Sequence, residues 1–408
     1  MEAVNQKSGI WNLFFVYVGF MTLIAWNLVL NVTPYFIFAI DKDYFSVLSF
    51  AFILAQTVAF LTANQLFGKL SSKAVFVVVP LLMLVSFYLI LFFVEFPAVP
   101  KEDQAKNVLW NKVLTFVFTS ILGFVSAVFQ GRSVAVCSKN GEKEVVLWNF
   151  GGALSGVLAS LLAIALGFAF PDPPLKPDDT PDRERSLEVM RLRIFVYLVV
   201  CLLLFVGYYL VNYLFNRDNR SAMEDKEELL EQMTASQSEG PSASKVVAKS
   251  LSLLLSIFFL YVVTIHFLVK IVVVVTKVHH SKTFTLTLGI FFLVFNAADA
   301  AGKFLKPFLA GFPDVVLHVF NALRLAVWGT GFFICRSEHV EGSFIQGSLF
   351  FCLMLFLIGF SNGLLTNSLM VKAADRFSMG AEKGMAGYYS VLFLILGLLG
   401  GSLLGLVV

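Results

Sequence analysis

The stretch Phe-Asn-Ala-Ala-Asp-Ala-Ala-Gly-Lys, residues 295–303, lies inside an apolar run that covers residues 283–308. If this run is helical, Asp299 and Lys303 lie one turn apart on the same face, with Asn296 one turn before Asp299. An acidic or basic side chain at the middle of a membrane costs about 2.5–3.5 kcal/mol even on lenient scales, so it normally faces a protein interior or a water-filled path. We therefore expect this turn inside a helical bundle, either as a structural ion pair or as part of a pathway.

The composition of the chain is that of a polytopic membrane protein. Of its 408 residues, 58% are hydrophobic and 14% are charged, whereas soluble domains have about 25% charged residues. The mean hydropathy is +0.83. The formal net charge of +3 is too small to indicate binding to a nucleic-acid polymer. The four cysteines lack the paired spacing of a metal site or a disulfide framework, so we expect no metal and no cofactor.

Apolar runs long enough to cross about 30 Å of hydrocarbon recur along the whole chain. They cover residues 10–38, 45–67, 74–94, 113–136, 145–170, 194–215, 250–275, 283–308, 315–335, 344–374 and 385–408. The first run has no small-residue cleavage pattern and is expected to remain as a span. The predicted fold is an all-α integral membrane protein with about eleven transmembrane helices, and an odd number puts the termini on opposite sides of the membrane.

Polar segments divide the chain. Residues 171–193 contain several Pro and Asp residues and are predicted to form a solvated loop. Residues 216–249 combine a charged stretch with a Ser-, Gly- and Pro-containing tail, as flexible linkers do. The expected divisions are a cytoplasmic N-terminus (1–9), an N-terminal bundle of six spans (10–215), a cytoplasmic linker (216–249) and a C-terminal bundle of five spans (250–408). Transporters that rock around a central site have such a two-bundle layout.

The distribution of Lys and Arg among the loops favours one orientation. With the N-terminus in the cytoplasm, the inner segments hold more of these residues than the outer segments. The excess is small, because five of the outer residues fall in one loop. The expected C-terminus is extracellular.

Two further polar residues within the spans carry information. Arg324 lies midway along the ninth run and needs an acidic partner, for which Asp299 is the nearest candidate along the chain. Gln130 ends an apolar run just before Gly131. Its amide is expected either to face a cavity or to form a hydrogen bond to another helix.

The first span carries polar and aromatic side chains at helical spacing. Trp26 and Asn27 are followed by Asn31, Tyr35 and Phe36. A Trp near mid-span is less easily explained as part of the aromatic belt than one at the membrane surface.

Four blocks of residues follow one another along the chain. They are Trp26-Asn27 with Tyr35-Phe36, Gln130-Gly131, residues 295–303 followed by Arg324, and Phe360-Ser361-Asn362-Gly363 with Ala381-Glu382, Gly384 and Ala386-Gly387. Together the blocks are specific and extend over almost the whole chain. In this order they resemble the equilibrative nucleoside transporter family, which has eleven spans and an architecture related to the major facilitator fold.

The resemblance implies a set of binding residues. In the family a first-span Trp packs beside the base, a fourth-span Gln binds the base edge, and an acid and a base in the eighth span hold the ribose hydroxyls. The substrate-binding residues expected on this basis are Trp26, Leu30, Gln130, Phe292, Asn296, Asp299 and Lys303. The residues expected to have structural or gating roles are Asn27, Arg324, Asn362 and Gly363.

The resemblance also implies the activity, which is the transport of nucleosides, with purine nucleosides expected, by alternating access and facilitated diffusion. The family's eighth-span Arg is Lys303 here, which loses the planar fork that can hold two hydroxyls at once. A nucleobase carrier is therefore an alternative, as is proton-coupled transport of either solute. A membrane-embedded enzyme or a channel is more distant, because the spans hold few polar groups. We expect no enzymatic activity.

The expected partners follow from the same resemblance. They are a small nucleoside or nucleobase and the lipid bilayer. We expect the protein to function as a monomer in the plasma membrane.

Overall fold

The structure is a computed structural model of the full chain. It describes residues 9–40, 44–66, 72–95, 104–173, 183–218, 243–278, 284–305, 311–336, 348–378 and 380–407. Most of the expected N-terminal tail and residues 219–242 of the expected linker lie outside the described residues.

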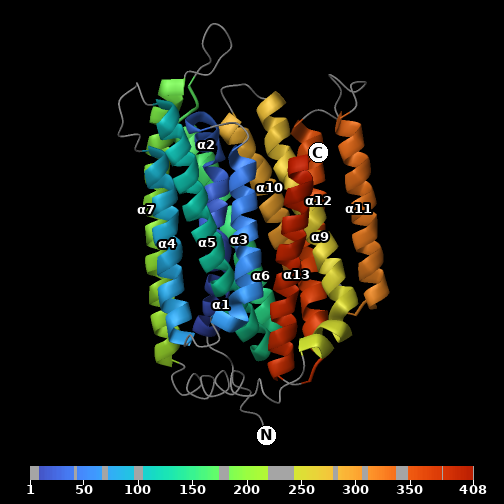
Figure 1. The fold of residues 1–408 in the computed structure, drawn as a ribbon. Coiled ribbons are helices and arrows are strands. Elements are labelled where there is room, and N and C mark those ends of the chain that lie inside the picture. The colour runs from blue at the N-terminus through green and yellow to red at the C-terminus, as the bar shows by residue number, and fades with distance from the viewer. Residues whose placement is uncertain are drawn as a thin grey trace.

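The described residues form eleven long helices and one short helix, α2, without any strand (Figure 1). The helices of the first half are α1 (Gly9–Asn31), α2 (Thr33–Ala39), α3 (Tyr44–Leu66), α4 (Ser72–Glu95), α5 (Gln104–Asn140), α6 (Glu142–Ala169) and α7 (Arg183–Asp218). Those of the second half are α9 (Ala243–Val278), α10 (Phe284–Phe304), α11 (Asp314–Arg336), α12 (Ser348–Asp375) and α13 (Gly380–Val407).

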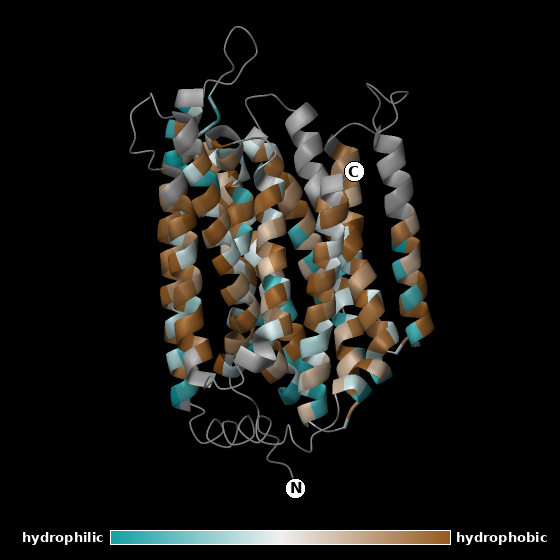
Figure 2. Cartoon of the chain, viewed as in Figure 1, coloured by the Kyte–Doolittle hydropathy of each residue, from teal (hydrophilic) through white to brown (hydrophobic). Residues whose placement is uncertain are grey.

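The predicted all-α membrane fold is confirmed. Within the described residues, nine helices are long and apolar enough to cross a membrane, and α3 contains a shorter apolar stretch, Ser46–Thr62. Hydrophobic residues cover most of the length of the helices (Figure 2). On α7, the side chains of Leu203, Val206 and Leu210 are 64%, 58% and 58% exposed. Exposed apolar side chains in this number fit contact with lipid rather than water.

The single span predicted over residues 10–38 is wrong in one respect, because the helix breaks between α1 and α2. Pro34 lies in the first turn of α2. Proline has no backbone N–H, and its ring collides with the carbonyl four residues earlier. That carbonyl belongs to Leu30, and it accepts a hydrogen bond from the Thr33 hydroxyl at 2.5 Å instead.

The solvated loop predicted over residues 171–193 is also shorter in the structure. Helix α7 begins at Arg183, so the last part of that segment is helical. Arg193 is only 2% exposed, because its guanidinium binds Asp172 and Thr285 at 2.8 Å each. A sequence pattern rich in charge predicts solvation, and here tertiary pairing overrides it.

The helices form two groups that lie side by side. Helices α1 to α7 occupy one side of the molecule and α9 to α13 the other (Figure 1). The described residues thus place six long helices in the first group and five in the second, as in the predicted two-bundle fold. Helix α1 begins at the lower end of the bundle and α13 ends at the upper end, as expected for an odd number of crossings.

Within the second group, α10 and α12 approach each other through glycines. A Cβ added at Gly363 would lie 1.9 Å from the carbonyl oxygen of Asp299, and one at Gly302 would lie 2.2 Å from that of Phe360. Small residues at such positions let helix backbones come close in a membrane. The backbone of α10 around Asp299 is therefore held directly against α12.

We predict that Gly363→Ala lowers the thermal unfolding midpoint of the detergent-purified protein. The added methyl group would overlap the backbone of α10, and overpacking of this kind costs about 1–3 kcal/mol. Gly311→Ala is the matched control, because nothing lies within 4 Å of a Cβ added at Gly311. Equal midpoints for the two variants would contradict the close approach of α10 and α12.

Candidate functional site

A cavity of about 170 Å³ lies between the two groups of helices. Its lining includes all seven of the residues expected to bind substrate, and two of the four expected to have structural roles. These nine are Trp26, Asn27, Leu30, Gln130, Phe292, Asn296, Asp299, Lys303 and Asn362. Arg324 of α11 and Gly363 of α12 lie outside the lining.

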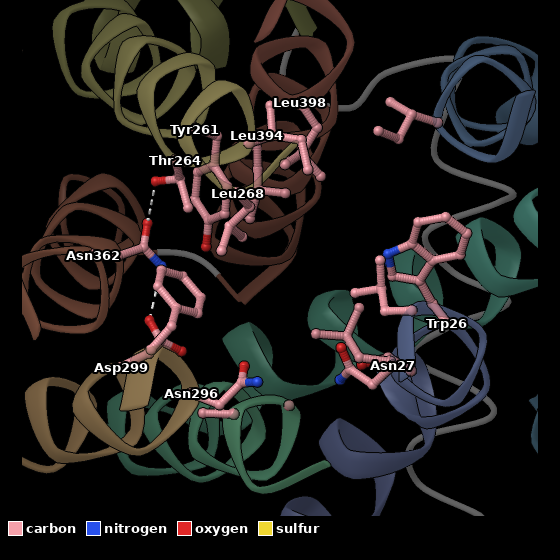
Figure 3. A pocket seen from close by; sticks show the side chains of 18 of the residues that line it. Trp26, Asn27, Tyr261, Thr264, Leu268, Asn296, Asp299, Asn362, Leu394 and Leu398 are labelled. Atoms are coloured by element: carbon pink, nitrogen blue, oxygen red, sulfur yellow. Dashed lines mark hydrogen bonds between the residues drawn. The ribbon is translucent and has the colours of Figure 1, made fainter. Parts of the chain in front are cut away.

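The cavity wall formed by α10 carries a buried ion pair. The Lys303 ammonium donates a hydrogen bond to Asp299 Oδ2 at 2.7 Å, and the two residues are 5% and 4% exposed. Asp299 Oδ1 accepts a second hydrogen bond, from the Asn362 amide on α12, also at 2.7 Å (Figure 3). Each carboxylate oxygen has two lone pairs, so each retains capacity to accept a hydrogen bond from a solute.

Arg324 does not pair directly with Asp299, so that candidate pairing is wrong. In the described residues its guanidinium donates to the carbonyls of Leu260 and Ile358 at 2.8 and 3.1 Å, and to the Thr264 hydroxyl at 2.7 Å. Thr264 in turn lies 2.9 Å from Asn362 Oδ1. The arginine therefore reaches the carboxylate through two intervening side chains.

The end of α10 is fixed by one more polar contact from α12. The Asn367 amide donates to the Lys303 carbonyl at 2.9 Å, and Asn367 is fully buried. Together with the glycine contacts, this hydrogen bond restricts the position of the backbone that carries the ion pair.

The opposite wall, formed by the first group of helices, is aromatic. The Trp26 ring stacks on the Phe52 ring with centroids 4.1 Å apart and an interplanar angle of 12°. Trp26 lies across the cavity from Asn362 and Tyr261 (Figure 3). An aromatic wall facing a charged, hydrogen-bonding wall suits a solute with one flat apolar part and one hydroxyl-bearing part.

Two amides between these walls have different environments. The Asn296 amide donates to the Ser160 hydroxyl of α6 at 3.3 Å, which links the two groups of helices. Gln130 is 4% exposed, and its Oε1 has no hydrogen-bond partner among the described residues. An unpaired buried carbonyl oxygen of this kind costs about 1–3 kcal/mol unless a ligand satisfies it.

Asn27 has a packing role in this structure. Its side-chain amide donates to the Ser155 hydroxyl of α6 at 2.7 Å, and its backbone carbonyl accepts a hydrogen bond from the Asn31 side-chain amide. It lines the cavity but is tied to its neighbours.

Sequence reasoning missed several lining residues. Phe52 is one of 45 phenylalanines in the chain and has no distinguishing pattern. Tyr261 and Thr264 lie one turn apart in the seventh apolar run. Two hydroxyls at that spacing could have indicated a polar face on this helix. No three His, Cys, Asp or Glu side chains of the described segments gather closely enough to hold a metal ion.

A family model and two solved structures resemble this chain. Residues 116–408 match a family model described as nucleoside transporter. A search of curated proteins finds no match.

Two solved structures share the fold. A variant of the fucose:proton symporter FucP of E. coli has a TM-score of 0.56 and 14% identity, over 97% of this chain and 90% of that chain. The xylose transporter XylE of E. coli, in a partially occluded inward-open conformation, has a TM-score of 0.57 and 13% identity, over 97% and 98%. At these identities the similarity concerns the fold alone.

We predict that the stability cost of breaking the ion pair depends on which charges remain. Lys303→Met leaves the buried carboxylate of Asp299 without its ammonium, and loss of one partner of a buried pair costs about 3–5 kcal/mol. The double variant Asp299→Asn with Lys303→Met removes both charges, so it should recover most of the loss in thermal unfolding midpoint.

The control for this comparison is Lys383→Met. Lys383 lies 3.8 Å from Asp375, and these side chains are 30% and 50% exposed, so the change should cost less than about 1 kcal/mol. A double variant as unstable as Lys303→Met alone would show that charge burial does not govern this site.

Proposed function

The chain belongs to the nucleoside transporter family, and from this premise we propose that it carries purine nucleosides across the membrane by alternating access. Transport is by facilitated diffusion. The observation that carries the proposal is the placement of the Asp299–Lys303 ion pair in the wall of a cavity between two groups of helices, opposite the stacked rings of Trp26 and Phe52.

The ion pair is suited to the sugar. A hydroxyl can donate to Asp299, and the Lys303 ammonium has two N–H groups beyond the one that bonds Asp299. Hydrogen bonds to charged groups are about twice as strong as neutral ones, so two hydroxyls held here orient the solute firmly. Because a nucleoside is neutral, it leaves the two charges to balance each other.

The aromatic wall is suited to the base. Trp26 and Phe52 offer apolar surface to any flat ring, and a purine buries more of it than a pyrimidine does. The unpaired Gln130 Oε1 can accept an N–H group from the edge of the base. These two features support purine nucleosides as the substrate.

One residue favours a second candidate, a nucleobase carrier. Lys303 replaces the family's Arg and lacks the planar fork that could bind two hydroxyls together. A carrier that binds the base alone would rely on Trp26 and Gln130 and would have little need of the ion pair. Proton-coupled transport remains the alternative to facilitated diffusion for either solute.

Alternating access requires contacts between the two groups of helices that can break. At the lower end of Figure 1, α5 ends and α13 begins, and these helices touch closely. A Cβ added at Gly387 would lie 2.0 Å from the Ser138 hydroxyl oxygen. The Tyr388 hydroxyl donates to the Phe60 carbonyl of α3. We call these two contacts, Gly387 with Ser138 and Tyr388 with Phe60, the inner gate, because they would have to break for the cavity to open at this end.

At the upper end, Asp172, Arg193 and Thr285 form what we call the outer latch. Asp172 follows α6, and it accepts hydrogen bonds from the Thr285 backbone N–H and hydroxyl at 2.9 Å each, so it caps α10 from the other group of helices. Arg193 of α7 donates to both Asp172 and Thr285 at 2.8 Å. Separation of the two groups at this end has to break these bonds.

We also propose a location and orientation. The small excess of Lys and Arg in the loops at the lower end supports a cytoplasmic N-terminus and an extracellular C-terminus. We propose that the protein acts as a monomer in the plasma membrane.

The direct test is uptake of radiolabelled adenosine in a host that lacks nucleoside transport. Adenosine uptake should be saturable and insensitive to a proton uncoupler, and Asp299→Asn should reduce it at least about tenfold, because the site loses a charged hydrogen-bond acceptor for the sugar. Surface expression, measured in parallel, should persist.

Asp375→Asn, at a partly exposed carboxylate, is the control and should transport normally. Hypoxanthine uptake without adenosine uptake would favour the nucleobase carrier, and sensitivity to the uncoupler would favour proton coupling. Normal adenosine uptake by Asp299→Asn would overturn the assignment of the site.

The outer latch gives a separate prediction. Asp172→Asn should weaken the capping of α10 and favour opening at this end, because a neutral amide binds Arg193 and the α10 N-terminus less strongly than a carboxylate. With Ala153→Cys as a reporter in the cavity wall and the native cysteines replaced, a membrane-impermeant thiol reagent added outside should react severalfold faster. An unchanged labelling rate would exclude the latch from gating.

A further inference from the structure

A chain of hydrogen-bond donors from three helices, α11, α9 and α12, leads to Asp299 on α10. We propose that Thr264 is a positioning residue for the sugar site, which links Arg324 to Asp299 through Asn362. We call Arg324, Thr264 and Asn362 the relay. The inference rests on the proposed function, because it assigns the relay to the carboxylate that binds the sugar.

The direction of the relay follows from which atoms can donate. Asn362 Nδ2 donates to Asp299 Oδ1 at 2.7 Å, so the other end of this amide, Oδ1, faces Thr264 at 2.9 Å and can only accept. The Thr264 hydroxyl therefore donates to Asn362. Its lone pair accepts from the Arg324 guanidinium at 2.7 Å, so every donor in the series points towards Asp299.

The Leu260 carbonyl competes with Asn362 for the Thr264 proton. It lies 2.8 Å from the Thr264 hydroxyl oxygen, which is the usual contact of a helical threonine with the residue four positions earlier. Arg324 Nη1 donates to that carbonyl at 2.8 Å, and the helical N–H of Thr264 faces it as well, so both of its lone pairs are engaged. This favours donation of the Thr264 proton to Asn362.

The relay is buried. Thr264, Asn362 and Arg324 are 3%, 3% and 6% exposed, and hydrogen bonds at low dielectric polarise one another. Among the described residues, the other hydrogen bonds of Arg324 go to backbone carbonyls. Thr264 is therefore the side chain through which the hydrogen bonds of Arg324 reach the carboxylate.

The consequence concerns the orientation of the carboxylate. Asn362 holds Oδ1 of Asp299 while Lys303 holds Oδ2, so the plane of the carboxylate is fixed. Without the Thr264 hydroxyl, the Asn362 amide loses one of the hydrogen bonds that restrain its rotation, so it turns away from Asp299 more readily. Binding of the sugar hydroxyls would then have to fix the orientation of the carboxylate as well. The entropy lost in this ordering weakens the binding.

The test compares Thr264→Val, which replaces the hydroxyl with a methyl group of similar size, with Thr264→Ser, which retains the hydroxyl. Uptake of adenosine is measured beside that of 2′,3′-dideoxyadenosine, which lacks the two ribose hydroxyls. We expect Thr264→Val to raise KM for adenosine about tenfold and to leave KM for the dideoxy analogue unchanged. Thr264→Ser should stay within about twofold of the wild type for both.

A general packing defect would raise KM equally for both solutes, and that result would overturn the proposal, as would an unchanged KM for adenosine in Thr264→Val. Where Thr264→Val does not reach the surface, Thr264→Ala repeats the comparison without added bulk. If the wild-type protein transports adenosine but Thr264→Val and Thr264→Ser have the same KM for adenosine, the relay is refuted and the proposed function is not. A wild type that transports no adenosine would refute the proposed function and the relay with it.

Discussion

The structure depends on the burial of two opposite charges, those of Asp299 and Lys303, within a membrane-spanning helix. In hydrocarbon neither charge could be tolerated alone, and even as a pair they need further hydrogen bonds to offset the loss of water. The surrounding helices supply them: α12 contributes Asn362 to the carboxylate and Asn367 to the backbone. This requirement explains why these two asparagines of α12 face the charged turn of α10.

The close packing of α10 on α12 follows from the same requirement. Asn362 and Asn367 are short side chains, and they reach α10 because Gly363 and Gly302 let the two backbones approach. The result is a rigid polar wall on one side of the cavity. On the other side, Trp26 and Phe52 form an uncharged aromatic wall. One group of helices therefore supplies the charged wall of the cavity and the other group supplies the aromatic wall.

Much of this arrangement could be predicted from the sequence, because it depends on local spacing. Asp299 and Lys303 four residues apart define their own pairing in any helix, and the length of the apolar runs defines the spans. The predictions that failed concern contacts between residues far apart in the sequence. The sequence offered Asp299 as the partner of Arg324 but could not show that Thr264 and Asn362 lie between them. Arg193 was assigned to a loop, although Asp172 and Thr285 pair with it in the buried latch.

We propose that the ion pair on α10 faces a passage shared by the two groups of helices and binds the sugar of a neutral nucleoside. A cryo-EM structure of the protein with adenosine bound is the decisive experiment. We expect ribose hydroxyls within about 3 Å of the Asp299 carboxylate and the Lys303 ammonium, with the purine lying against Trp26. Adenosine bound elsewhere, with the ion pair covered by packed side chains and out of contact with the ligand, would contradict it.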